Sequence, residues 1–158
     1  MKTDANVLET DEIADLIDQH LDLEGPLLPI LHAAQARYGH IPEAALAPIA
    51  AALNITRAEL HGVISFYHDF RERPAGRHVV RLCRSEACQS VGAERLAEEV
   101  KAVLGIGWHE TTANNAVTLE PVYCLGLCAC GPAAMVDGRP LGRASAAGIK
   151  ARLEGAER

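Results

Sequence analysis

Residues 78–88 have the sequence HVVRLCRSEAC. The first six of them are rich in valine and leucine, which predicts a β-strand that delivers Cys83 at its carboxyl end. Residues 117–124, VTLEPVYC, follow the same pattern and deliver Cys124. Ligand sites in open α/β sheets lie at the carboxyl ends of the strands. The two stretches therefore predict a small α/β sheet with cysteine loops at one edge.

Four cysteines in these loops form a candidate ligand set for an inorganic centre. They are arranged as Cys83-x4-Cys88 and Cys124-x3-Cys128, with 35 residues between the pairs. Iron–sulfur clusters are held by sets of four cysteine thiolates. Gly126 and other small residues in the loops allow backbone N–H groups to approach inorganic sulfide. The pattern predicts one [2Fe–2S] cluster on these four cysteines.

Zinc, disulfides and buried thiols are the competing interpretations. Structural zinc sites most often use Cys-x2-Cys pairs, which both loops lack, although zinc tolerates spacers of up to about four residues. A reducing compartment disfavours disulfides, and four core thiols beside glycines are hard to explain. Zinc therefore stays open as an alternative. The fifth cysteine, Cys130, could replace Cys128 as a ligand, but we interpret it as a bystander.

The composition favours a soluble protein of the cytoplasm. The chain has 158 residues, of which 49% are hydrophobic, so it can form packed cores. A net charge of −6 argues against nucleic-acid binding, which needs clustered lysine and arginine. Residues 1–12 lack the basic start and the apolar stretch of a secretory signal. No apolar run is long enough to span a membrane, so we expect no direct membrane insertion.

The chain is expected to be an α+β protein with two domains and a linker between them. Residues 1–70 carry apolar side chains at helical spacing and predict a helical bundle, in which Thr56 and Glu59 form a capping box. Residues 77–158 predict the element order β-α-β-β-α, with Asp137-Gly138 as the tight turn of a hairpin.

No catalytic residue is predicted in this chain. No Gly-x-Gly-x-x-Gly sequence follows a predicted strand, so the chain shows no nicotinamide site of its own. The seven histidines are scattered, and nothing pairs them with a metal or a nucleophile. An electron carrier without a substrate pocket must be supplied with electrons by a partner protein.

The cysteine loops resemble those of the thioredoxin-like [2Fe–2S] ferredoxin family. The resemblance rests on residues 83–88, CRSEAC, on residues 124–128, CLGLC, and on Gly131-Pro132. Residues 62–67, GVISFY, are similar to the helical region that the small iron–sulfur subunits of this family share. The similarity covers nearly the whole chain, from about residue 25 to about residue 153.

This resemblance implies a fold, a cofactor and partners. The family includes the small iron–sulfur subunit of respiratory complex I and its counterparts in NAD-reducing hydrogenases and NAD-dependent formate dehydrogenases. The resemblance implies a thioredoxin-like C-terminal domain whose cluster is bound by Cys83, Cys88, Cys124 and Cys128. It also implies a helical N-terminal domain that docks on a flavoprotein subunit, which carries FMN and the NAD site.

Among the branches, the chain is most similar to the gamma subunit of soluble, molybdenum-containing, NAD-dependent formate dehydrogenase. The supporting residues are 66–70, FYHDF, where the complex I branch usually has a threonine after the tyrosine, and 81–88, RLCRSEAC. A separate molybdenum- and iron–sulfur-containing subunit would then oxidise formate, and this chain would be a non-catalytic electron-transfer subunit. The alternatives are the equivalent subunit of complex I or of a NAD-reducing hydrogenase, and a zinc-stabilised scaffolding subunit.

Arg84 is expected to tune the cluster, because it directly follows the ligand Cys83. A nearby cation stabilises the added negative charge of a reduced cluster and so raises its reduction potential. Arg81 should lie on the same side of the strand as Cys83. If both arginines are instead solvated, screening would leave little effect.

Overall fold

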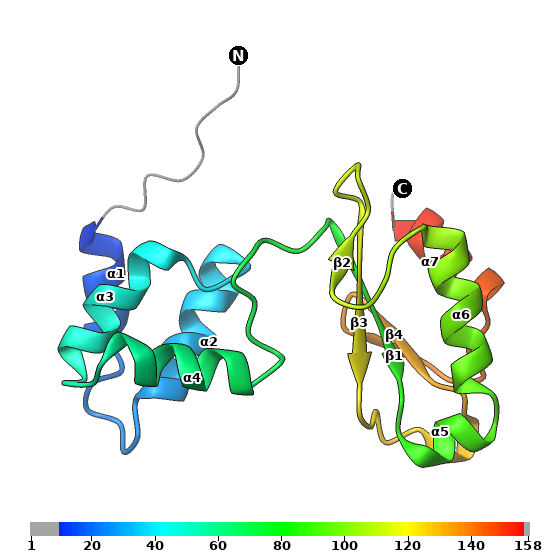
Figure 1. Ribbon diagram of the computed structural model, residues 1–158, viewed down its shortest axis with the longest axis horizontal. Helices are drawn as coiled ribbons and strands as arrows, with labels where there is room; N and C mark the ends of the chain where they lie inside the picture. The colour runs from blue at the N-terminus through cyan, green and yellow to red at the C-terminus, as the bar shows by residue number, and fades with distance from the viewer. Residues whose placement is uncertain (1–9, 157–158) are drawn as a thin grey trace. The chain divides into compact units, whose positions relative to one another are not determined.

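The computed structural model describes residues 10–156, which divide between Pro74 and Ala75 into two compact units (Figure 1). We call residues 10–74 the first unit and residues 75–156 the second unit. The prediction that the chain starts without a secretory signal falls largely on residues 1–9, which lie outside the described part. In residues 10–156 no helix is both long enough and apolar enough to cross a membrane.

The first unit is helical, because its apolar residues recur at the spacing of one helix face. Fully buried aliphatic side chains from three helices, Ile30, Leu31, Ile49 and Leu60, form the centre of its core. The described part of this unit contains the helices α1 (Thr10–Asp18), α2 (Leu27–Tyr38), α3 (Glu43–Ala52) and α4 (Arg57–Phe66).

The predicted capping box is present at the start of α4. The Thr56 hydroxyl accepts a hydrogen bond from the backbone N–H of Glu59 at 3.2 Å. The Glu59 carboxylate accepts one from the backbone N–H of Thr56 at 2.8 Å. Two of the N–H groups at this end are therefore satisfied by side chains, which confirms this helix start.

The second unit is built on a five-stranded mixed sheet in the order β2-β3-β1-β4-β5. β1 and β3 are parallel, and the other neighbouring pairs are antiparallel. Val80, Leu119 and Ala134 are fully buried in its core. The strands are β1 (His78–Cys83), β2 (Glu110–Thr111), β3 (Val117–Val122), β4 (Ala134–Val136) and β5 (Arg139–Leu141).

Two helices pack on this sheet, and a short helix follows its first strand. α6 (Ala93–Leu104) contacts β1, α7 (Ala146–Ala156) contacts β4, and the two helices contact each other. Figure 1 shows both helices beside the sheet, with the short helix α5 (Glu86–Ser90) directly after β1. The predicted α+β class, a helical part followed by a thioredoxin-like sheet domain, is confirmed by this arrangement.

The predicted element order lacks two of the five strands and one helix, although the predicted hairpin turn at Asp137-Gly138 implied the strand β5 that follows it. β2 and α5 were not predicted, because a two-residue strand and a five-residue helix are too short for a periodic pattern. The second predicted strand was also too long: β3 ends at Val122, two residues before Cys124. β1 ends at Cys83, whose register partner is Val122, so the chain beyond Val122 has no strand left to pair with.

Candidate functional site

The parallel pairing of β1 and β3 brings the two cysteine loops to one edge of the sheet. Cys83 is the last residue of β1 and lies in register with Val122, the last residue of β3. The Arg84 N–H donates to the Val122 carbonyl at 2.7 Å, which extends this pairing by one bond. The loops of Cys83 and Cys124 therefore start side by side, as the strand pattern predicts.

Cys83 and Cys88 are buried together under apolar side chains. They are 2% and 1% exposed and form one small apolar cluster with Ala93 and Ala133. Leu125 and Leu127, which alternate with the cysteines of the second loop, pack against this cluster. The leucines therefore bring the second loop against the first and shield Cys83 and Cys88 from water.

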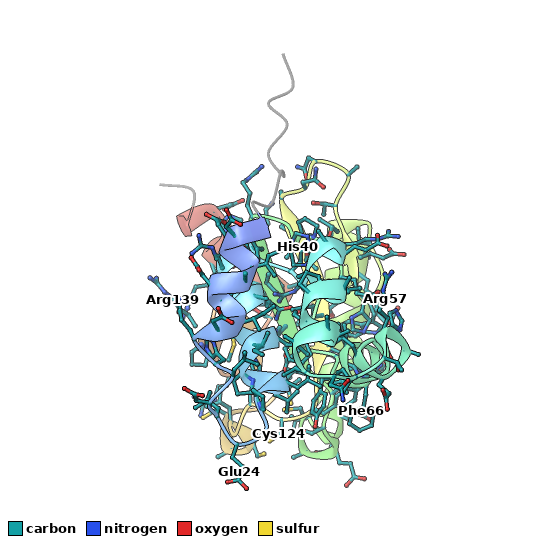
Figure 2. All side chains as sticks on the ribbon, turned by 90° about the vertical axis from the view of Figure 1, so that its left-hand side faces the viewer. Glu24, His40, Arg57, Phe66, Cys124 and Arg139 are labelled. Atoms are coloured by element: carbon teal, nitrogen blue, oxygen red, sulfur yellow. The ribbon has the colours of Figure 1, made fainter. Side chains whose placement is uncertain are left out.

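Cys124 and Cys128 have exposed side chains (Cys124 is labelled in Figure 2). The backbone N–H of Gly126 donates to the Cys124 sulfur at 3.3 Å. Gly126 has a φ of 72°, a left-handed conformation that favours glycine. The tight turn between the two cysteines therefore depends on this glycine, which directs an N–H group at a sulfur atom.

The environments of Cys83 and Cys88 shift their pKa values in opposite directions. Burial alone would raise the pKa of Cys83, but hydrogen bonds, first from Ser85 and then from Cys88 and the Leu125 backbone, lower it below its ordinary value. Burial and the adjacent Cys83 raise the pKa of Cys88. Since the thiolate is the form that binds metal, Cys83 loses its proton for metal binding more easily than Cys88 does.

Ser85 is a residue of the site that the sequence did not reveal. Its Oγ lies 3.1 Å from the Cys83 sulfur, within hydrogen-bonding distance. It also directly precedes α5, whose first turn includes Cys88. A serine two residues after a predicted ligand is the only signal that could have indicated this role.

Gly131 is required by the close approach of two loops. A Cβ atom at this position would lie 2.7 Å from the Val91 Cγ2 and 3.7 Å from the Cys88 sulfur. The carbonyl of Cys128 would be 3.5 Å away. The segment that follows Cys128 therefore packs directly on the loop of Cys88, which brings the two loops that carry Cys88 and Cys128 into contact.

Cys130 contacts the segment that follows β5. The three residues from Cys128 to Cys130 form a short 3-10 helix. A Cβ atom at Gly142 would be 2.8 Å from the Cys130 Cβ and 3.9 Å from its sulfur. The Cys130 carbonyl accepts a hydrogen bond from the N–H of Arg143. Cys130 thus packs on the segment after β5, whereas Cys128 belongs to the turn beside Cys88.

The side chain of Arg84 turns toward α6. Its guanidinium donates to the Glu94 carboxylate at 2.7 Å and lies over the Trp108 ring, 5.3 Å from the centroid. Its Nε is buried and has no hydrogen-bond partner. Arg81, two residues before Cys83 in β1, is paired with Glu120 at 2.9 Å. Both arginines near Cys83 therefore have an acidic partner, which reduces the charge that each presents.

The donor set fits an iron–sulfur cluster. All four candidate ligands are free thiols at or just beyond the ends of β1 and β3, Cys83 and Cys88 lie in an apolar environment, and Cys124 accepts a backbone N–H. All-thiolate sets of four are the usual ligands of such clusters. Among residues 10–156 no three His, Cys, Asp or Glu side chains lie close enough together to hold a metal ion, so the structure brings the two cysteine loops to one edge without drawing all four thiols together.

Comparison with known proteins matches the chain to one protein family. The family model of the thioredoxin-like [2Fe-2S] ferredoxins matches residues 13–157. The chain is 34% identical over 157 residues to a subunit of the NADH-quinone oxidoreductase of Pseudomonas aeruginosa, a match that covers 98% of this chain and 95% of the relative. It is 28% identical over 139 residues to the HndA subunit of the NADP-reducing hydrogenase of Solidesulfovibrio fructosivorans, covering 88% of this chain and 81% of the relative.

A solved structure shares the fold. The crystal structure of an NAD+-reducing [NiFe]-hydrogenase in the air-oxidized state superposes with a TM-score of 0.68 at 29% sequence identity. The match covers 83% of this chain but 22% of the hydrogenase chain, so most of that chain has no counterpart here.

Proposed function

This chain belongs to the thioredoxin-like [2Fe–2S] ferredoxin family, and we propose that it transfers electrons through one [2Fe–2S] cluster held by Cys83, Cys88, Cys124 and Cys128. The observation that carries the assignment is the meeting of two cysteine loops at the carboxyl ends of β1 and β3. The packing of Leu125 and Leu127 on Cys83 and Cys88 supports it further.

The residues of the site have separate roles in this proposal. The four thiolates would bind the two irons, and Cys83, with its lowered pKa, is more readily deprotonated than Cys88, whose pKa is raised. Leu125 and Leu127 exclude water from one side of the site. A bound [2Fe–2S] cluster supplies storage for one electron at a time. The exposure of Cys124 and Cys128 leaves one side open for electron exchange with a partner.

The electrons must come from another protein, since the chain lacks a dinucleotide-binding fingerprint. We propose that the partner is a flavoprotein subunit that binds FMN and NAD. The names of two relatives, an NADH-quinone oxidoreductase subunit and a subunit of an NADP-reducing hydrogenase, support a nicotinamide-linked complex. The exposed aromatic side chains Phe66 and Tyr67 of the first unit are candidates for the docking surface (Phe66 is labelled in Figure 2).

We propose further that the chain is a subunit of a soluble, molybdenum-containing, NAD-dependent formate dehydrogenase of the cytoplasm. It rests on the resemblance of residues 66–70 and 81–88 to the gamma subunit of that enzyme. In this assembly a molybdenum- and iron–sulfur-containing subunit oxidises formate, and two electrons reach NAD+ through the flavoprotein. This chain would exchange single electrons with the flavin and take no part in the chemistry of formate.

A second candidate is the corresponding subunit of an NADH-quinone oxidoreductase. The match to the Pseudomonas aeruginosa protein, which covers almost the full length of both chains, supports it. A NAD-reducing hydrogenase is the related third possibility, supported by the shared fold.

Purification of the native assembly with an affinity-tagged copy of the full chain distinguishes these candidates. We expect a flavoprotein to co-purify, with FMN, molybdenum and formate-dependent NAD+ reduction in the same fraction. Co-purification with quinone-reducing membrane subunits would assign the chain to an NADH-quinone oxidoreductase, and nickel with hydrogen-dependent activity would assign it to a hydrogenase. A chain that binds zinc and purifies without any redox partner would contradict the electron-transfer proposal.

A further inference from the structure

A cavity lies between α7 and the hairpin of β4 and β5. It has a volume of about 560 Å³ and is lined by Val136, Asp137, Arg139, Ala151, Arg152 and Gly155. Sites for small molecules in proteins are usually about 300–1,000 Å³ in volume. Gly155 contributes no side chain, and a Cβ atom there would meet nothing within 4 Å, so this face of α7 leaves room for a ligand.

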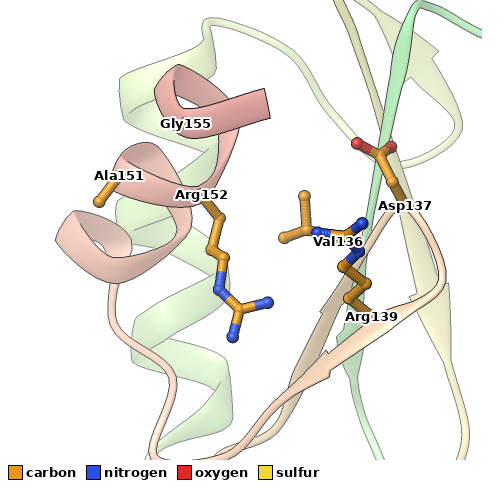
Figure 3. A pocket seen from close by; sticks show the side chains of 6 residues that line it. All are labelled: Val136, Asp137, Arg139, Ala151, Arg152 and Gly155. Carbon is orange, nitrogen blue, oxygen red and sulfur yellow. The ribbon is translucent and has the colours of Figure 1, made fainter. Parts of the chain in front are cut away.

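Two arginines from different elements reach into this cavity. Figure 3 shows Arg152 extending from α7, and Arg139 from β5, toward the space between the helix and the hairpin. Neither guanidinium forms an ion pair with any carboxylate of residues 10–156. The acidic residues of α7 do not neutralise them, because Glu154 is paired with Lys150.

The one carboxylate in the lining is already engaged on the opposite side. Asp137 accepts a hydrogen bond from the His78 ring at 2.7 Å and one from the Val79 backbone N–H at 2.8 Å. Both of its oxygens therefore face β1 and hold the hairpin turn on that strand. Counting only the carboxylates of residues 10–156, the cavity has two arginines without an ion-pair partner and one carboxylate whose oxygens have other partners.

We propose that this cavity binds a small molecule that carries two oxyanion groups, phosphates or carboxylates, one on each of Arg139 and Arg152. A guanidinium presents a planar pair of N–H donors that matches a phosphate or carboxylate, and such charge-assisted bonds are stronger than neutral ones. Val136 and Ala151 are the two residues of the lining with apolar side chains.

This cavity is separate from the cysteine site. Asp137 lies beside Val79, near the start of β1, whereas Cys83 is at the end of that strand. Four residues of an extended strand span about 13 Å. A ligand in the cavity therefore does not touch the candidate iron ligands, and its binding can be measured without changing them.

The test is an NMR titration of the full ¹⁵N-labelled chain with its cluster oxidised, with pyrophosphate in one arm and citrate in the other. Sodium chloride keeps the ionic strength constant. We expect saturable shifts of the amide signals of Val136, Ala151 and Gly155 and an unchanged visible spectrum. The probe that binds more tightly identifies a phosphate or a carboxylate ligand.

Two variants and a matched control make the test specific. Arg139→Gln and Arg152→Gln should each weaken binding roughly tenfold, because each removes a charge-assisted contact. Arg95→Gln removes one positive charge from α6, outside the cavity, and should bind as the unsubstituted chain does. The proposal is overturned if neither probe saturates, if both cavity variants bind normally, or if a polyglutamate peptide shifts these signals while both small anions do not.

Discussion

Gly131→Ala tests the packing of the two cysteine loops against each other. The backbone of Gly131 has a φ of −65° and a ψ of 159°, which alanine adopts without strain. The only obstacle is steric, since the added Cβ would lie 2.7 Å from the Val91 Cγ2. Real Cβ atoms do not approach a carbon so closely, so one of the two loops has to move.

The size of the effect follows from the position of Val91. Overpacking in a well-packed site costs roughly 1–3 kcal/mol. Val91 is 51% exposed and can move outward, so we expect the lower end of that range, about 1 kcal/mol. This corresponds to a roughly fivefold change in an equilibrium or a rate. The destabilisation affects the loop packing around Cys88, whose sulfur is 3.7 Å from the new methyl group.

The assay is the half-life of the visible absorbance of the oxidised chain in the presence of an iron chelator. Gly131→Ala should shorten that half-life roughly fivefold, and adding Val91→Ala should restore most of it by removing the atom that clashes. Gly62→Ala is the matched control, because a Cβ there meets nothing within 4 Å and lies in α4. Equal half-lives for Gly131→Ala and Gly62→Ala, or no recovery in the double variant, would refute this packing.

Three further predictions concern charge, capping and activity. Arg84→Glu should lower the midpoint potential of the cluster, more at low salt than at high salt, and Glu94→Gln should raise that potential by leaving Arg84 unpaired. If an EPR-monitored redox titration shows no shift in either variant, Arg84 does not tune the cluster. Thr56→Ala should destabilise the first unit by about 1 kcal/mol in a urea titration followed by far-ultraviolet circular dichroism, and a simultaneous change in the cluster spectrum would contradict a local effect. The purified chain alone should neither oxidise formate nor reduce NAD+, and turnover in the absence of other subunits would disprove a carrier role.

The pairs of cysteines and the strands before them could be predicted because their signals are local. A run of valine and leucine that ends in Cys83 predicts both a strand and the edge at which its cysteine lies. The capping box at Thr56 depends on residues three apart and was equally visible.

The remaining features depend on contacts between residues that are distant in the sequence. Nothing near Cys130 in the sequence indicates that Gly142 lies against it. The pairing of Arg84 with Glu94 and Trp108 depends likewise on the packing of α6 beside β1. A prediction that placed Arg84 in the loop could not show that its side chain turns toward that helix.

The central claim is tested most directly by the metal content and spectrum of the purified full chain. We expect about two irons and two inorganic sulfides per chain, visible absorption when oxidised and an EPR signal when reduced. Serine at Cys83, Cys88, Cys124 or Cys128 should bleach or strongly shift that spectrum, whereas Cys130→Ser should leave it intact. Zinc in place of iron, or loss of the cluster in Cys130→Ser with Cys128→Ser unaffected, would contradict the account.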